Sequence, residues 1–156
     1  MTSTSGGSYN DSLGYAKLEE ARNKSSKVMA LSQDLWEGME KSDYGFLKRI
    51  IDTTTGFNVK ALRFQAELIP SGKHNGKHRH KDEIIIHVVQ GHGHTIVEDK
   101  RVDWKEGDTL YVPIWFWYQH FNDDAEVDAR LIAWSNGVLT EKLGLCAFEL
   151  AEKANY

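Results

Sequence analysis

Apolar and polar residues alternate along much of the chain after Phe46, and this pattern predicts β-strands. Residues 62–68 show it most clearly, because apolar side chains there alternate with Arg63, Gln65 and Glu67. We expect the apolar face of this strand to be buried and the polar face to be wetter. Further short strands are expected over residues 84–89, 94–98, 102–104, 109–112, 118–121 and 129–134. Many short strands separated by turn residues predict a sandwich or a barrel.

Helical periodicity replaces this alternation at both ends of the chain. Residues 1–12 are small and polar and are expected to form a loose tail. Apolar residues then recur every three or four positions over residues 13–41, and residues 138–153 also have a helical pattern. We expect the N-terminal helices to pack on the barrel exterior or on a partner. The predicted organisation is a tail and helical segment over residues 1–45 and an all-β domain with a C-terminal helix over residues 46–156.

Composition limits the classes of function. The chain has 156 residues, which fits one domain, and its formal net charge of −4 favours neither nucleic acid nor an anionic membrane surface as a partner. The single cysteine, Cys146, excludes an internal disulfide framework and suits a reducing compartment. Residues 1–12 have no signal-like apolar segment, and no apolar run reaches the roughly 20 residues that a membrane span needs. We expect a cytoplasmic protein.

The histidines are the strongest chemical signal in the sequence. All seven lie between His74 and His120, and His78 and His80 are separated by one residue. If this segment is a strand, the two imidazoles lie on one face, about 6.6–7 Å apart along the backbone. Such a pair can hold one metal ion, although two solvated histidines in a polar loop would give the same spacing.

Two longer stretches resemble the paired signature of the cupin superfamily. Residues 72–91, GKHNGKHRHKDEIIIHVVQG, carry a Gly, then His-x-His, then a later Gly. Residues 107–122, GDTLYVPIWFWYQHFN, open with Gly-Asp and contain a Pro and a final Asn. The resemblance covers roughly residues 60–135 and implies a jelly-roll β-barrel with helices at the N- and C-terminal ends. It also implies that His78 and His80 are ligands of one metal ion.

A narrower resemblance points to one branch of this superfamily. Arg79 between the histidines and the run from Pro113 to Asn122 are most similar to gentisate 1,2-dioxygenases. This likeness implies non-haem iron(II), with another divalent metal as the alternative, together with a small aromatic substrate and O2. Trp115 and Trp117 would then be walls for the substrate or simply core packing. His74 precedes the motif and is a candidate for the mouth of the barrel, or an exposed loop residue.

Two positions depart from the family pattern. Most cupins place a glutamate ligand where this chain has Ile84, and Glu83 has the opposite strand parity. The third histidine of the gentisate branch falls on Tyr118, with His120 two residues further along. Three interpretations stay open: His120 completes a three-histidine site, Tyr118 ligates the metal or bonds to a bound water or substrate and so acts in catalysis, or the site is degenerate.

The leading functional hypothesis is a component of an iron-dependent dioxygenase that cleaves the ring of a gentisate- or hydroquinone-like compound. The first alternative is a non-catalytic small subunit, because the chain also resembles the small subunit of hydroquinone 1,2-dioxygenase, which pairs with a larger iron-binding chain. The second alternative is a metal-dependent lyase or isomerase, because cupins host many chemistries. Exposed sheet edges favour a homo-oligomer or a hetero-oligomer with a larger subunit.

Overall fold

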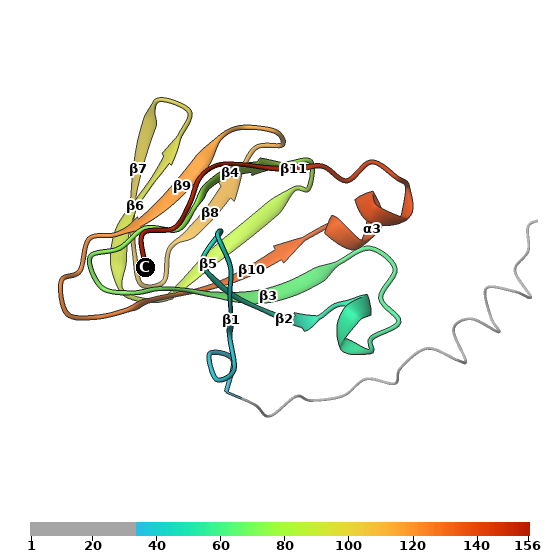
Figure 1. Ribbon diagram of the computed structural model, residues 1–156, viewed down its shortest axis with the longest axis horizontal. Coiled ribbons are helices and arrows are strands. Elements are labelled where there is room, and N and C mark those ends of the chain that lie inside the picture. Colours follow the sequence, from blue (N-terminus) through green and yellow to red (C-terminus); the bar gives the residue numbers. More distant parts are fainter. Residues whose placement is uncertain (1–33) are drawn as a thin grey trace, which may run out of the picture. The chain divides into compact units, whose positions relative to one another are not determined.

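The computed structural model describes residues 34–156, which form two antiparallel β-sheets packed face to face (Figure 1). The helices predicted over residues 13–33 lie outside the described residues. The prediction that this helical segment continues to Lys41 is wrong. Residues 34–39 form a turn, and the two-residue strand β1 (Glu40–Lys41) follows it and pairs with the next strand.

The strand bounds largely match the expected pattern. One sheet has the order β1-β2-β3-β10-β5-β8 and the other β11-β4-β9-β6-β7, so strands distant in sequence are neighbours in each sheet. This arrangement confirms the predicted jelly-roll. The remaining strands are β2 (Phe46–Ile51), β3 (Arg63–Ile69), β4 (Lys77–His80), β5 (Ile84–Gln90), β6 (His92–Val97), β7 (Lys100–Lys105), β8 (Thr109–Val112), β9 (Tyr118–Asn122), β10 (Ala129–Ser135) and β11 (Phe148–Glu152).

The hydrophobic core fills the space between the two sheets. Strands β5 and β10 supply most of it through alternate inward residues, including Ile86 and Leu131, while Trp104 and Tyr118 come from the opposite sheet. Tyr118 also lines the cavity described below, so the apolar core continues directly into the wall of that cavity. The core therefore fixes the position of a side chain that the sequence had marked as chemically unusual.

Strand β3 is where the predicted faces are reversed. Arg63 and Glu67 are buried, and Gln65 lies on the same inward face, whereas Leu62 just before the strand is 61% exposed. The prediction that the polar positions of residues 62–68 form the wetter face is therefore wrong, although the apolar Ala66 is buried as expected. The polar side chains point inward because they line a cavity and bond to one another there, so hydrogen bonds offset their burial.

The C-terminal segment is only partly helical. Helix α3 (Gly137–Lys142) is followed by Gly144 with a left-handed φ of 68°, a conformation that glycine adopts readily at helix ends. Residues 148–152 then form β11, which pairs antiparallel with β4 (Figure 1). The helix predicted over residues 138–153 is thus too long: it ends before Gly144, and residues 148–152 instead pair with the edge of β4.

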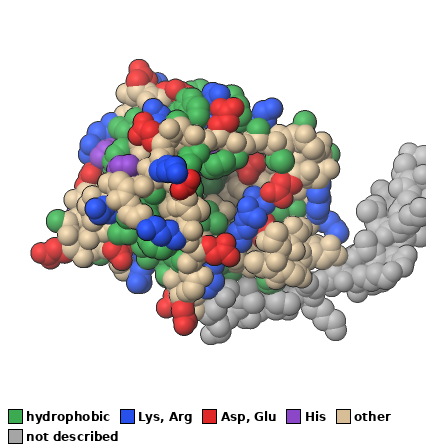
Figure 2. All heavy atoms as spheres, in the orientation of Figure 1, with side chains coloured by type: hydrophobic (Ala, Val, Ile, Leu, Met, Phe, Trp, Pro, Cys, Tyr) green, Lys and Arg blue, Asp and Glu red, His purple; other side chains and the backbone are tan. Residues whose placement is uncertain are grey.

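Charged side chains are spread over the surface. Figure 2 shows acidic and basic side chains interspersed on the face in view, without a large region of one sign. In the part of the chain that the structure describes, no helix has the length and apolar character needed to cross a membrane.

Candidate functional site

A cavity of about 570 Å³ lies between the two sheets. Strand β11 contributes Phe148 and Leu150 to its wall, and β9 contributes Tyr118. The cavity is large enough for a single-ring organic molecule, since pockets for small ligands span about 300–1,000 Å³. Its remaining lining residues are Ser42, Asp43, Tyr44, Leu47, Arg49, Arg63, Gln65, Glu67, His78, His80, Asp82, Ile84, Ser135, Glu141, Cys146 and Ala147.

The structure brings His78 and His80 together on the cavity side of β4, as their spacing predicts. Their ring centroids are 5.7 Å apart. Nδ1 of His78 lies 2.9 Å from the carbonyl oxygen of Gly76, and Nδ1 of His80 lies 3.1 Å from that of Asp82. A carbonyl can only accept, so both Nδ1 atoms carry the proton and both Nε2 atoms are unprotonated, each with a lone pair. Metal-binding histidines are oriented in this same way by their second nitrogen.

Burial keeps His78 neutral. It lowers the pKa of His78 to about 3; the hydrogen bond to Gly76 opposes this shift, and the nearby His80 and His120 add to it. Burial also lowers the pKa of His80. Neutral imidazole is the form that binds metal ions, so these residues need no deprotonation step near neutral pH.

Tyr118 sits directly beside the histidine pair. It is the ladder partner of His78, with ring centroids 4.1 Å apart, and its hydroxyl lies 2.7 Å from Nε2 of His80. Because Nε2 has no proton, the Tyr118 hydroxyl donates this bond. Burial raises the pKa of Tyr118 above its usual range, and the carboxylates of Glu67 and Asp82 raise it further. The residue is therefore a neutral phenol that occupies the lone pair of His80.

His120 shares the inward face with Tyr118 but does not line the cavity. Its Nδ1 lies 2.7 Å from Oγ1 of Thr95, which also accepts a hydrogen bond from Trp104. Its buried Nε2 has no hydrogen-bond partner among the described residues. Burial and the nearby His80 lower the pKa of His120 to about 3. Such an orphaned nitrogen costs about 1–3 kcal/mol.

A polar group that the strand pattern did not predict lies beside the histidine pair, with the ring centroid of Tyr44 4.6 Å from that of His78. Tyr44 donates a 2.5 Å hydrogen bond to Oε2 of the buried Glu67, and Gln65 donates one of 2.9 Å to Oε1. Burial raises the pKa of Glu67, although both hydrogen bonds oppose that shift. The only sequence signal for Gln65 and Glu67 is their polar positions in an alternating strand, and alternation alone predicts the wetter face for them.

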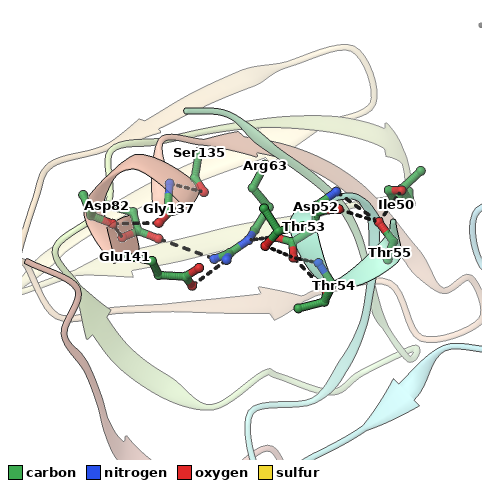
Figure 3. Close-up of polar contacts among 11 residues, drawn as sticks. Ile50, Asp52, Thr53, Thr54, Thr55, Arg63, Asp82, Ser135, Gly137 and Glu141 are labelled. Atoms are coloured by element: carbon green, nitrogen blue, oxygen red, sulfur yellow. Dashed lines mark hydrogen bonds and ion pairs between the residues drawn. The ribbon is translucent and has the colours of Figure 1, made fainter. Parts of the chain in front are cut away.

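An ion network centred on Arg63 forms part of the cavity wall, and Figure 3 shows its residues. Arg63 lies between Asp52 on one side and Glu141 on the other, each at 2.5 Å, and Asp82 lies 3.9 Å away. Arg63 and Glu141 both line the cavity. Because Arg63 is surrounded by carboxylates, its charge is balanced within the protein.

The predicted substrate residues Trp115, Trp117 and His74 do not line the cavity. The two tryptophan rings instead flank the guanidinium of Arg79, whose Cζ lies 4.3 Å and 4.4 Å from their centroids. Nδ1 of His74 lies 2.8 Å from the side-chain nitrogen of Gln119. All three side chains have partners away from the cavity, so the structure offers no support for placing them around a substrate.

The donor set in the cavity fits a metal ion in part. Within residues 34–156, no group of three or more His, Cys, Asp and Glu side chains is arranged to hold a metal ion. The donors that the cavity does present are the Nε2 atoms of His78 and His80, the second of which accepts the Tyr118 hydrogen bond, and the Tyr118 oxygen. Glu83, by contrast, is exposed and bonds to Asn136, as its strand parity predicts.

Comparison with known proteins agrees with this architecture. The family model described as "Cupin domain" matches residues 65–135. A gentisate 1,2-dioxygenase of Aquipseudomonas alcaligenes is 35% identical over 119 residues, which are 72% of this chain and 33% of that protein. A 5-aminosalicylate 1,2-dioxygenase of Comamonas sp. is 29% identical over 91 residues, covering 58% of this chain and 24% of that protein. The chain thus spans about a third or less of these relatives.

Solved structures show the same fold at lower identity. A salicylate 1,2-dioxygenase of Pseudaminobacter salicylatoxidans has a TM-score of 0.59 and 21% identity, covering 67% of this chain and 29% of its own. A cupin 2 domain-containing protein of Halorhodospira halophila has a TM-score of 0.55 and 19% identity, covering 65% of this chain and 68% of its own. The curated relatives are ring-cleaving dioxygenases, whereas these structural likenesses establish the fold alone.

Proposed function

This chain belongs to the cupin superfamily, and from that premise we propose that it is a component of a non-haem iron dioxygenase that cleaves the ring of a gentisate- or hydroquinone-like compound. The observation that carries the proposal is the orientation of His78 and His80. Backbone carbonyls fix both Nδ1 protons, so two Nε2 lone pairs belong to side chains that line one cavity.

His78, His80 and Tyr118 are the residues that would hold the metal. Imidazole nitrogen suits iron, and a phenol oxygen can serve as a further donor. A bound iron(II) would supply the activation of dioxygen. For Tyr118 to join, its hydroxyl would release the bond that it donates to His80. His120 is outside the cavity lining, with its ring centroid 5.2 Å from that of Tyr118, so we assign it no ligand role while Tyr118 is in place.

The cavity walls would bind and orient the substrate. Phe148 and Leu150 give apolar contact and exclude water from the histidines. Glu67 holds a proton more readily than an exposed carboxyl because burial raises its pKa. With Tyr44 it can donate or accept hydrogen bonds to substrate hydroxyls.

Oxygen uptake tests this proposal. The full chain would be reconstituted anaerobically with iron(II) and then mixed with aerated buffer and a panel of dihydroxylated aromatics, including gentisate and hydroquinone. We expect uptake that depends on an aromatic compound and is lost in His78→Ala. An absence of uptake with every compound would contradict the catalytic form of the proposal.

A non-catalytic small subunit is the second candidate, and Tyr118 is the observation that favours it. This residue stands where the related branch has a third histidine, and its hydroxyl already bonds to His80. Such a chain would act with a larger iron-binding partner. Co-expression with the product of a neighbouring gene would separate the candidates, because activity found only in the pair favours the subunit and activity of the chain alone excludes it.

A further inference from the structure

The strand that carries both histidines has little backbone support on one side. Strand β4 pairs with β9 through a single residue pair, His78 with Tyr118. On its other side β4 pairs with β11, which is itself at the edge of the sheet. The interior strands β3, β5, β6 and β10 each have several ladder pairs on both sides. Strand β4 lacks this support, so it needs other contacts to hold its side chains in register.

Arg79 supplies such contacts. Its side chain has the opposite parity to His78 and His80 and points away from the cavity. The guanidinium lies between the rings of Trp115 and Trp117, at 4.3 Å and 4.4 Å, and bonds to Oε2 of Glu149 at 2.8 Å and 2.6 Å. These four residues, here called the Arg79 clamp, join β4 to β11 and to the loop before β9.

Trp115 is held in an unusual conformation to take part. Its φ is 66°, in the left-handed region that non-glycine residues rarely adopt, and its backbone N–H donates to the carbonyl oxygen of His80 at 2.9 Å. Strain of this kind persists only where surrounding contacts compensate for it. This conformation allows the Trp115 N–H to bond to His80 on β4, and it turns the indole toward Arg79.

We propose that the Arg79 clamp is a positioning device for the histidine pair: it fixes the rotation of β4, so that both Nε2 atoms keep their direction into the cavity. The planar guanidinium is essential, because it stacks between two rings and forms two bonds to one carboxylate at the same time, which a lysine cannot do. The consequence for metal binding rests on the proposed function, whereas the orientation of the imidazoles does not.

The test compares Arg79→Gln and Arg79→Lys with Arg101→Gln in the full chain. Arg101 is a matched control, because it lies on β7 of the same sheet and pairs with Asp103 and Asp123 away from the cavity. Long-range proton–nitrogen NMR spectra of the metal-free protein report the tautomer of each histidine and the hydrogen bond at Nε2 of His80. Cobalt(II) titration followed by visible absorbance then reports the affinity of the site.

We expect both Arg79 variants to lose the uniform Nδ1-protonated tautomer and the Tyr118–His80 bond. We expect cobalt affinity to fall about tenfold or more, as is usual when support of metal ligands is removed. Arg101→Gln should match the wild type in both measurements. Unchanged imidazole signals in a folded Arg79→Gln protein would overturn the proposal. If that variant does not fold, Glu149→Gln, which removes only the ion pair, should show the same changes to a smaller degree, and wild-type signals there would overturn it.

Failure of the proposed function gives a different result. A wild-type chain that binds no cobalt would contradict the metal site, while the imidazole signals of the metal-free variants would still decide whether the clamp orients the histidines.

Discussion

The hydroxyl of Tyr118 lies 2.7 Å from Nε2 of His80 and donates a hydrogen bond to the lone pair that a metal ion would use. The two histidines are therefore oriented to bind a metal ion, but one of their two Nε2 atoms already accepts a hydrogen bond from the protein itself. Both histidines have their protons fixed on Nδ1, which is the arrangement of a metal site, and Tyr118 competes for one of the two available nitrogens.

Tyr118→His should strengthen metal binding, because it adds a third imidazole in place of a competing hydroxyl. We expect the affinity for iron(II) to rise at least about tenfold, measured by anaerobic equilibrium dialysis. Tyr118→Phe is the matched control: it frees the His80 lone pair without adding a donor. A Tyr118→His protein that binds no better than the wild type would show that this position does not limit binding.

Replacing His120 by leucine should leave iron(II) affinity within about twofold of the wild type. The reason is that His120 does not line the cavity and its Nδ1 bonds to Thr95. Removing its unpartnered Nε2 should offset the lost bond, so thermal stability should change little. A loss of binding comparable to that of His78→Ala would instead make His120 the third ligand.

Glu67 should make the protein less stable as the pH rises. Burial raises the pKa of Glu67 in the folded state, so the folded protein binds a proton that the unfolded chain has released. Its contribution to stability is complete at acid pH and is lost as the pH rises from the unfolded pKa through the folded one. Urea unfolding at several pH values should show this slope in the wild type and lose it in Glu67→Gln. An unchanged slope in the variant would contradict the assignment.

Asp52 should have the opposite effect at low pH. Burial alone would raise the pKa of Asp52, but hydrogen bonds from the backbone and side chain of Thr54 and from Arg63 lower it to about 2. Its stabilising contribution is present above the unfolded pKa near 4 and is lost as the pH falls toward 2. Asp52→Asn should cost about 2 kcal/mol at neutral pH and less at pH 2. Equal losses at both pH values would contradict this.

The sequence could predict the jelly-roll and the histidine pair because both depend on local patterns. The strands and turns of the structure lie close to those that the sequence predicts, and His78 and His80 lie together on one face of β4 as their spacing predicts. The paired motifs also mark Tyr118 as the position of the third histidine of the related branch, and the ladder between β4 and β9 pairs this residue with His78.

The polar wall of the cavity could not be predicted in the same way. Arg63, Gln65 and Glu67 follow the alternation of an exposed face, and only the tertiary partners Tyr44, Asp52 and Glu141 make their burial tolerable. Trp115 and Trp117 could not be resolved from the sequence either, because aromatic residues near a motif fit a substrate wall or packing equally well, and only the structure shows that their partner is Arg79.

Metal content of the purified full chain tests the metal site most directly. Wild type and His78→Ala would be loaded anaerobically with iron(II), passed through a desalting column and measured by atomic spectroscopy. The arrangement of His78 and His80 predicts close to one iron per wild-type chain and almost none in the variant. Equal iron in the two proteins, or none in the wild type, would contradict a metal site at this histidine pair.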